Sequence, residues 1–305
     1  AKELCDEIVF LRPLASDFGA YIPADATVTF GAMKPCAMMP PACYAQGRLT
    51  LVDFGFDVDD AEPAVEMVDD ETAGELVRLP RLTDSKYSRG VVGLVTGSAR
   101  YPGAAVLTVK GASRANVGMV RYLGPQRAQD MVLAARPEAV LGKGHVQSWV
   151  VGSGVPGAED GPEGDDIQRE SIGRLLRHYD AGEPDAPNGV EPEGDAYDMP
   201  PIVVDAGALD LLPNRVPPQV LITPHAAELA RLLQRLGEDI DVDDVLAEPW
   251  RCARRAHALT GATVLLKGAV TILVGEEDGE ERTILSGAPC PRRRWTNRRS
   301  WKGAP

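Results

Sequence analysis

From residue 89 onward, short runs of apolar residues alternate with segments whose apolar residues recur at helical spacing. The run GVVGLVTG (90–97) predicts a strand, and AAVLTVKGASRA (104–115) predicts the helix that follows it. The alternation repeats with GMVRYLG (118–124) as a strand and RAQDMVLAA (127–135) as a helix. Strands that alternate with helices are typical of a parallel sheet with crossover helices, so the pattern predicts an α/β fold.

Further apolar runs extend this pattern through the rest of the domain. Helices are expected between them at 167–179, 226–234 and 243–259. Two acidic stretches rich in Gly and Pro, 157–166 and 180–199, predict surface loops. The elements together indicate a doubly wound α/β sandwich. The additional strands are expected at 147–153, 201–207, 219–225, 263–269, 270–276 and 282–287.

The two ends of the chain follow different patterns. Apolar runs at 26–33 and 48–56 predict two strands separated by a Pro-rich turn. The acidic, polar stretch after them has only a short helical pattern near 70–77, and we interpret it as a linker. Beyond residue 288 an Arg/Trp-rich tail without apolar periodicity begins, which we interpret as foreign to the domain; the alternative is a basic arm for nucleic acid.

Composition narrows the class of protein. With 305 residues and 44% hydrophobic content, the chain can bury a sizeable core. A net charge of -13 argues against nucleic acid or an anionic membrane as the main partner. We expect a cytoplasmic protein, because no apolar run approaches the roughly 20 residues of a membrane helix and the start does not resemble a signal peptide.

Five cysteines form an odd set without a C-x-x-C pair, so reduced, partly buried thiols are expected rather than disulfides or a zinc site. They are Cys5, Cys36, Cys43, Cys252 and Cys290.

Two glycine-bearing loops follow predicted strands. The loop 97–104 contains Gly97 and Gly103 and precedes a helix, whose free N–H groups favour a phosphate; the alternative is a turn that needs glycine only for its backbone. The loop 150–160 contains glycines in the G-x-G-x-x-G spacing of dinucleotide-binding folds. The acidic, helix-averse residues that follow this spacing argue against a conventional dehydrogenase.

Three polar side chains stand where predicted strands end. His225 faces the crevice outside a sheet edge or caps the following helix, in which Glu228 falls one turn later. Lys267 before Gly268 could meet a phosphate or be a solvated turn residue. Asp205 could contact a ligand or Mg²⁺, or cap a helix. The remaining histidines, His145, His178 and His257, are expected at the surface.

Taken in order, five stretches resemble the NAD(P)H-hydrate dehydratase family over about residues 85–288. They are 84–123, VVGSGVPG (150–157), PIVVDAGALDLL (201–212), LITPHAAELARLL (221–233) and TVLLKGAVTIL (263–273). Upstream, 23–57 resembles the C-terminal end of the NAD(P)H-hydrate epimerase domain that precedes the dehydratase in bifunctional repair enzymes.

The resemblance implies an α/β fold, a ribokinase-like three-layer sandwich with a mostly parallel central sheet, incomplete at the C-terminus. It divides the chain into an epimerase-type remnant (1–60), a linker (61–84), a truncated dehydratase domain (85–288) and an aberrant basic tail (289–305).

The implied reaction is dehydration of the S form of NAD(P)H-hydrate to NAD(P)H at the expense of ADP or ATP, with Mg²⁺ as cofactor. The expected partners are NAD(P)H-hydrate and an adenine nucleotide, without nucleic acid or membrane, and a homo-oligomer is expected. By motif, Ala104, Gly154 and His225 would bind the substrate, with Gly97, Gly103 and Asp205 as further candidates. The nucleotide would be held by Lys267, Gly268, Ala269, Val270 and Thr271.

The chain departs from the family pattern in two places. Gly207 and Asp210 replace the second acid and the amide of the commoner D-A-D-A-L-N motif. The family's G-x-G-D loop, whose Asp acts on the substrate, has no counterpart after 286–288, where the sequence continues as if read in another frame. We therefore identify no catalytic residue and expect weak or no activity.

The D-I-P-S-G region of the epimerase is not found before residue 24, so epimerase activity is not expected. The alternatives to a dehydratase are a ribokinase-like small-molecule kinase and a catalytically dead nucleotide-binding remnant.

Overall fold

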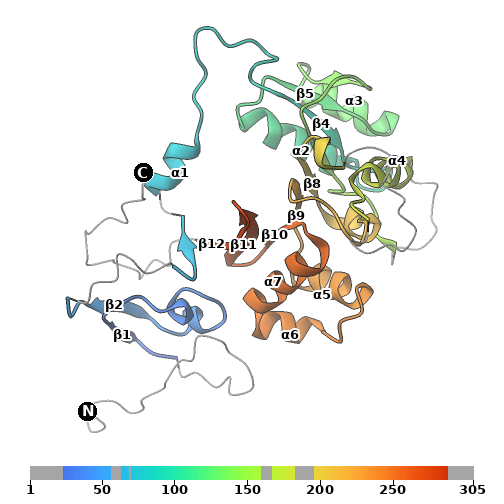
Figure 1. Ribbon diagram of the computed structural model, residues 1–305. Helices are drawn as coiled ribbons and strands as arrows, with labels where there is room; N and C mark the ends of the chain where they lie inside the picture. The colour runs from blue at the N-terminus through green and yellow to red at the C-terminus, as the bar shows by residue number, and fades with distance from the viewer. Residues whose placement is uncertain (1–22, 56–62, 69, 159–166, 183–195, 288–305) are drawn as a thin grey trace.

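A ten-stranded sheet forms the centre of the computed structural model, which describes residues 23–55, 63–68, 70–158, 167–182 and 196–287 (Figure 1). In chain order its strands are β3 (Glu66–Met67), β4 (Val91–Val95), β5 (Met119–Tyr122), β6 (Val140–Leu141), β7 (Ser148–Val151), β8 (Ile202–Val204), β9 (Val220–Ile222), β10 (Thr263–Leu266), β11 (Val270–Glu277) and β12 (Glu280–Gly287).

The spatial order of the strands is β3-β12-β11-β10-β9-β8-β7-β4-β5-β6. All neighbours from β10 to β6 run parallel, whereas β11 runs antiparallel to both β10 and β12. Strand β4 lies among the parallel strands and is buried along its whole length, as expected for a strand covered on both faces. The predicted mostly parallel sheet is confirmed.

Helices cover both faces of this sheet. Leu94 belongs to one hydrophobic cluster with Val109 of α2 (Pro102–Arg114) and Val132 of α3 (Gln126–Ala135). Its neighbour Val95 belongs to a second cluster with Leu176 of α4 (Ile167–Leu176), together with residues of the helix α5 (Ala226–Arg235). Because successive strand residues point to opposite faces, the two clusters form the two interfaces of a three-layer sandwich.

The predicted helix over 243–259 is wrong as a single element. Two helices are found, α6 (Val242–Ala247) and α7 (Pro249–Thr260), with Glu248 between them. Pro249 occupies the first turn of α7, where its missing N–H group costs nothing, and it could not continue α6. The side chain of Asp241 caps α6 separately by accepting a hydrogen bond from the Asp244 amide at 2.9 Å. The predicted helix at 167–179 is α4 continued by the short 3-10 helix η4 (Arg177–Tyr179).

His257 was expected at the surface, but it is buried. It lies on the buried face of α7, and its Nδ1 is 2.7 Å from the carbonyl oxygen of Ala262. The polar ring is accommodated because a backbone partner satisfies one nitrogen. His145 and His178 are exposed, as expected.

The described cysteines behave as expected. Cys36, Cys43 and Cys252 are buried thiols that take part in no disulfide among the described residues. Burial raises the pKa of the Cys252 thiol to about 11, so this thiol stays protonated at neutral pH. Cys5 and Cys290 lie outside the described residues.

The N-terminal part forms a sheet of its own. The two predicted strands are β1 (Ala26–Phe30) and β2 (Arg48–Val52), which pair in parallel. Between them lie two short 3-10 helices, η1 (Pro35–Ala37) and η2 (Ala42–Tyr44), from which Ala37 and Cys43 join the larger hydrophobic cluster. The outer side chains Phe30 and Phe54 are exposed and stack with ring centroids 5.5 Å apart.

The stretch expected to be a linker, 61–84, contains regular structure. Strand β3 extends the main sheet by pairing with β12, and Arg282 Nε donates to Glu66 Oε1 at 2.8 Å. The helix α1 (Asp70–Leu76) coincides with the short helical pattern near 70–77. Part of this stretch is therefore built into the edge of the larger domain, and the four-part division of the chain stays a prediction.

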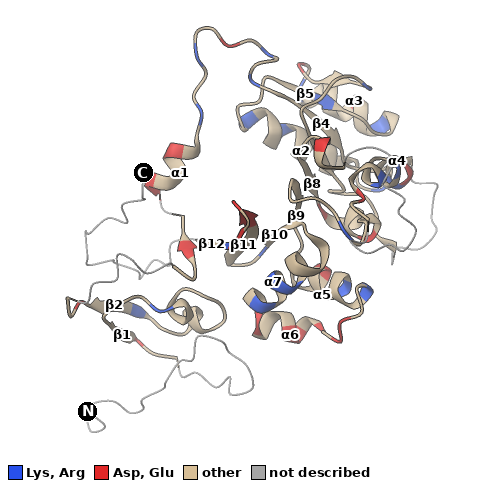
Figure 2. Ribbon diagram, viewed as in Figure 1, with Lys and Arg blue, Asp and Glu red and all other residues tan. Residues whose placement is uncertain are grey.

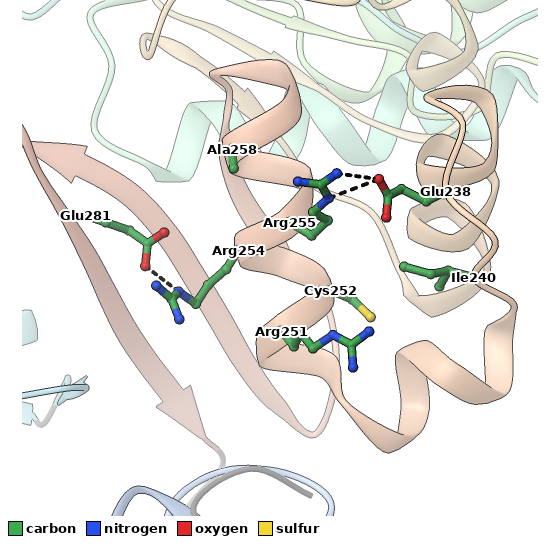
Figure 3. Close-up of a pocket in the computed structure, with 8 residues that line it drawn as sticks. All are labelled: Glu238, Ile240, Arg251, Cys252, Arg254, Arg255, Ala258 and Glu281. Atoms are coloured by element: carbon green, nitrogen blue, oxygen red, sulfur yellow. Dashed lines mark hydrogen bonds and ion pairs between the residues drawn. The ribbon is translucent and has the colours of Figure 1, made fainter. Parts of the chain in front are cut away.

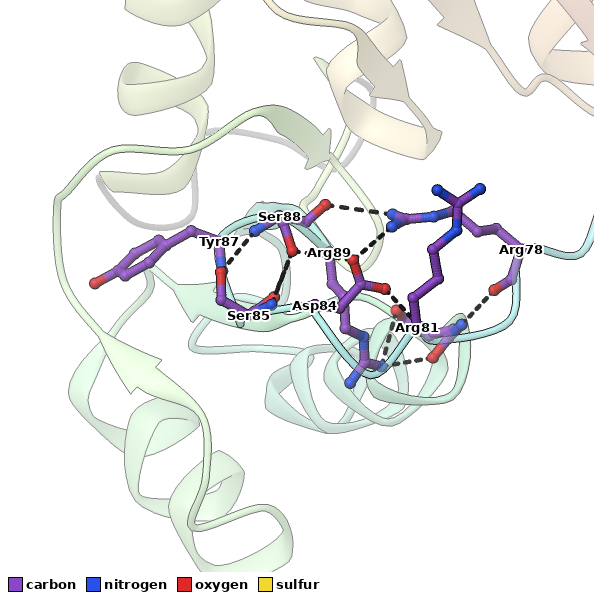
Figure 4. Close-up of polar contacts among 8 residues, drawn as sticks. Arg78, Arg81, Asp84, Ser85, Tyr87, Ser88 and Arg89 are labelled. Atoms are coloured by element: carbon purple, nitrogen blue, oxygen red, sulfur yellow. Dashed lines mark hydrogen bonds and ion pairs between the residues drawn. The ribbon is translucent and has the colours of Figure 1, made fainter.

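A polar network holds the chain just before β4 (Figure 4). The Asp84 carboxylate accepts hydrogen bonds from the Arg81 amide at 2.8 Å and from Arg78 Nη2 at 2.7 Å. Asn116, after α2, donates to the Arg78 carbonyl at 2.6 Å and accepts from Arg89 Nη2 at 2.5 Å. The backbone hydrogen bond from Arg81 holds the pKa of the Asp84 carboxyl below its usual value. The network ties the chain before β4 to the residues that follow α2.

Charged residues of both signs are spread over the helices, with arginines on α7 and acidic residues on α6 (Figure 2). Among the described residues, no helix combines the length and apolar character needed to cross a membrane. The predicted loops 157–166 and 180–199 lie largely outside the described residues, and so do 1–22 and the predicted tail 289–305.

Candidate functional site

The parallel strands β4, β7, β8, β9 and β10 bring five predicted residues to one edge of the sheet. These strands are neighbours and run in the same direction, so the loops after their carboxyl ends lie side by side. Ligands of open α/β sheets bind at such an edge. The residues in these loops are Gly97, Gly154, Asp205, His225 and Lys267.

Two predicted glycines and Ala104 form one side of this edge. The Gly97 amide donates to the Ser153 carbonyl at 2.7 Å. Gly154 has a φ of +72°, and a Cβ atom there would lie 2.2 Å from Ala104 Cβ and 3.4 Å from Gly97 Cα. Both the backbone conformation and the close approach therefore require glycine. Gly103 is exposed at the start of α2, and nothing lies within 4 Å of where its Cβ would be.

The G-x-G-x-x-G spacing does not form a dinucleotide turn. Residues 152–157 form turns and irregular structure rather than the start of a helix. Gly152 has a φ of +102°, and its Cβ would lie 1.9 Å from the carbonyl oxygen of Asp205. This glycine serves the close approach of the loops after β7 and β8.

Asp205 lies at the centre of a hydrogen-bond network. Its Oδ1 accepts from Lys267 Nζ at 2.8 Å and from Thr223 Oγ1 at 2.9 Å, and its Oδ2 accepts from Ser153 Oγ at 2.8 Å. Burial acts to raise the pKa of the Asp205 carboxyl, but the hydrogen bonds from Lys267, Ser153 and Thr223 outweigh it and lower the pKa. The carboxyl is therefore ionised at neutral pH. The side chain does not cap the following 3-10 helix η6 (Ala206–Leu211), so that alternative is wrong.

His225 caps α5 and still presents part of its ring. Its Nδ1 accepts from the Ala227 amide at 3.1 Å and the Glu228 amide at 3.4 Å, while Glu228 Oε2 accepts from the His225 amide at 2.7 Å. Because Nδ1 accepts, the proton of the neutral ring sits on Nε2. The side chain is 52% exposed, and its Nε2 lies 3.5 Å from Oε1 of Glu228.

Lys267 is paired rather than freely solvated. Its ammonium group contacts Asp205 and lies 3.5 Å from Glu228 Oε2, and its amide donates to the Pro224 carbonyl at 2.8 Å. The side chain remains 41% exposed. A positive charge is thus held at the edge by two carboxylates.

The other predicted nucleotide-binding residues differ in how far they are exposed to a ligand. Gly268 and Ala269 are exposed in the turn after β10. The side chain of Val270 is buried in the core, and Thr271 lies opposite Ser286 in the β11–β12 pair. Gly268 and Ala269 are therefore exposed to a ligand at the surface. The side chain of Val270 is not, so this residue could contact a ligand only through its backbone.

Three residues that complete the site were not predicted. Thr223 follows β9 directly and Ser153 lies two residues after the end of β7, and this position at the carboxyl end of a strand was the available signal. Gln168 had no such signal: it is a buried residue of α4 whose Nε2 donates to the carbonyls of Thr96 at 3.2 Å, Gly97 at 3.2 Å and Leu123 at 3.1 Å. It holds the Gly97 loop against the helix layer.

A separate pocket of about 390 Å³ lies between α7, the loop after α5 and β12 (Figure 3). Arg255 pairs with Glu238 and Arg254 with Glu281 at its rim. Its lining is Glu238, Ile240, Arg251, Cys252, Arg254, Arg255, Ala258 and Glu281. None of the predicted site residues lines this pocket.

The described residues contain no group of three or more His, Cys, Asp or Glu side chains that could hold a metal ion. At the sheet edge, both Asp205 oxygens already accept hydrogen bonds from protein groups. The arrangement therefore does not fit a protein-held Mg²⁺ ion.

Comparison with solved structures identifies this three-layer α/β sandwich as a ribokinase-like fold. A ribokinase-like superfamily protein from Enterococcus faecalis superposes with a TM-score of 0.54 at 17% identity, covering 74% of this chain and 73% of that one. An ADP/ATP-dependent NAD(P)H-hydrate dehydratase from Bacillus subtilis, co-crystallised with ATP/Mg²⁺, gives 0.55 at 21% identity, covering 72% of each chain. These likenesses show the fold, which confirms the predicted class.

Sequence comparison shows the family. Residues 194–290 match the profile of NAD(P)H-hydrate dehydratase. The bifunctional NAD(P)H-hydrate repair enzyme of Mycobacterium leprae is 38% identical over 260 residues, which are 84% of this chain and 47% of the relative. That of Corynebacterium glutamicum is 30% identical, covering 85% of this chain and 49% of the relative. The chain belongs to the NAD(P)H-hydrate dehydratase family, and it spans about half the length of the curated relatives it matches.

Proposed function

We propose that this chain binds NAD(P)H-hydrate and an adenine nucleotide at the edge formed by β4, β7, β8, β9 and β10, and acts as an ADP- or ATP-dependent dehydratase on the S form of the hydrate. The observation that carries the proposal is the position of Ser153. Its carbonyl accepts from the Gly97 amide, and its hydroxyl donates to Asp205. Ser153 thus joins the glycine-lined side (Gly97, Ala104 and Gly154) to the charged side (Asp205, His225 and Lys267) in one continuous site.

The glycine-lined side suits the hydrate. Ala104 and Gly154 are partly exposed and offer a ligand backbone and one methyl group, whereas Gly97 is buried against Ala105 and supports them from behind. On the charged side, His225 offers Nε2 as a hydrogen-bond donor to the ligand. We assign substrate contact to Ala104, Gly154 and His225, with Gly97 as their support.

The charged side suits the nucleotide. The Lys267 ammonium would meet a phosphate, and the exposed Gly268 and Ala269 would let it approach the backbone. Asp205 stays ionised and holds the Lys267 ammonium in place, so it orients a charge rather than donating a proton.

No group of described side chains could hold Mg²⁺ by itself, so the ion would be held mainly by the phosphates of the nucleotide. The positive charge opposite Asp205 is that of Lys267. Transferring a phosphoryl group needs positioned positive charge, and Lys267 supplies one such charge at this edge.

A second candidate is a protein that binds adenine nucleotide without turnover, because the residues placed at the sheet edge position charge and none of them is assigned as a catalytic acid or base. The epimerase-type origin of 1–60, the homo-oligomer and the cytoplasmic location stay predictions.

The test follows the near-ultraviolet absorbance of reduced nicotinamide when purified chain is mixed with hydrated NADH, Mg²⁺ and first ADP, then ATP. A thermal-shift titration with AMP runs beside it. Recovery of NADH supports the dehydratase, and stabilisation by AMP without recovery supports the binding protein. The absence of both responses would contradict both candidates. Turnover of sugars or vitamin precursors with ATP would instead favour the small-molecule kinase.

A further inference from the structure

The side chain of Glu228 contacts both halves of the charged side of the site. Its Oε2 accepts from the His225 amide at 2.7 Å and lies 3.5 Å from Lys267 Nζ. Its Oε1 lies 3.5 Å from His225 Nε2. The side chain is only 11% exposed, so solvent screens these interactions little.

The structure assigns Glu228 the role of a positioning residue that orients His225 and Lys267 together. This inference rests on the proposed function, in which His225 meets the hydrate and Lys267 meets the nucleotide. Glu228 itself reaches neither ligand in this arrangement, because its oxygens face these two side chains.

A structural alternative is that Glu228 serves only as a helix cap. It stands in the first turn of α5 and completes a reciprocal capping pair with His225. The cap explains the contact of Oε2 with the His225 amide. It does not explain the approach to Lys267, which belongs to a different element, 39 positions later in the chain.

The test uses Glu228→Gln, Lys267→Ala and their combination in the full chain, with AMP affinity measured by calorimetry. Glu170→Gln is the matched control, since Glu170 also lies in the first turn of a helix and pairs with a basic residue, Arg174. We expect Glu228→Gln to weaken AMP binding about tenfold and Glu170→Gln less than twofold. In the Lys267→Ala background, Glu228→Gln should cost less than twofold, because its effect acts through that lysine.

A tenfold loss that persists in the Lys267→Ala background overturns the inference, and so does an unchanged affinity in Glu228→Gln. If the unchanged chain does not bind AMP, the proposed function fails and a second measurement decides the inference. Trace labelling with acetic anhydride, read by mass spectrometry, should acetylate Lys267 at least threefold faster in Glu228→Gln, relative to the exposed Lys110. An equal rate overturns the positioning role.

Thermal denaturation of each variant shows whether it folds. Should Glu228→Gln fail to fold, Glu228→Asp takes its place: it keeps the charge near the cap and withdraws the carboxylate from Lys267. It should weaken AMP binding and expose Lys267 to acetylation in the same direction, and the absence of both effects overturns the inference.

Discussion

The ammonium group of Lys267 lies 2.8 Å from Oδ1 of Asp205, which joins the ends of two strands separated in the sheet by β9. The contact spans 62 positions of the chain. It creates an ordered positive charge at the sheet edge, and most of the expected behaviour of the site follows from it.

Removing this charge should weaken nucleotide binding. Lys267→Ala is expected to lower AMP affinity at least about tenfold, because a charge-assisted contact with phosphate is lost. Calorimetric titration measures the effect. Lys110→Ala removes an exposed lysine of α2 and serves as the control, for which an unchanged affinity is expected. Equal losses in both variants would contradict a nucleotide site at Lys267.

Asp205 should contribute to stability in a pH-dependent way. Its pKa is lowered in the folded chain, so its stabilising contribution is present above the unfolded pKa of about 4 and is lost as pH falls through the folded pKa. Asp205→Asn should lower the free energy of unfolding by about 1 to 3 kcal/mol at neutral pH. The difference in the free energy of unfolding between Asp205→Asn and the unchanged chain should become smaller at acidic pH.

Urea denaturation at neutral and acidic pH measures this difference. A difference of equal size at both pH values would show that the charge of Asp205 is not what stabilises the fold.

Gly154 should tolerate no side chain. Gly154→Ala adds a Cβ atom at 2.2 Å from Ala104 Cβ in addition to the strain of a positive φ. Gly142→Ala is the matched control, because Gly142 has a φ of +85° and open space around its Cβ position. We expect the control to cost about 1 kcal/mol and Gly154→Ala about 1 to 3 kcal/mol more.

Denaturant unfolding gives both values, and AMP titration of the folded variants shows whether the distortion reaches the charged side. Equal destabilisation would mean that Ala104 moves away easily and that the close contact does not constrain the site.

Gln168 should support the Gly97 loop. Gln168→Leu removes the donor for three carbonyl oxygens and is expected to destabilise the fold by about 1 to 3 kcal/mol. Gln126→Leu, at an exposed position where the side chain contacts only Asp130 among the interactions described, is expected to change stability by less than about 0.5 kcal/mol.

Hydrogen exchange locates the effect of Gln168→Leu. The amide of Gly97 should exchange faster in this variant, and unchanged exchange would show that the loop is held by other contacts.

The sequence pattern was sufficient for elements whose apolar residues form a clear period. The runs at 90–97 and 263–269 became β4 and β10 because their side chains fit a covered sheet. The pattern failed at Pro249, where helical spacing continued across a residue that ends α6, and at His257, whose burial depends on the carbonyl of Ala262. Strands of two residues, β3 and β6, are too short to carry a period.

The sequence by itself determined the family and the residues at the ends of the strands, since a motif and its position after an apolar run are local properties. Only the tertiary structure decided which of them meet. Strand order places β10 two positions from β8, so that Lys267 reaches Asp205 and Glu228 lies between His225 and Lys267. Such contacts arise from the lateral packing of strands and their loops, which no spacing along the chain encodes.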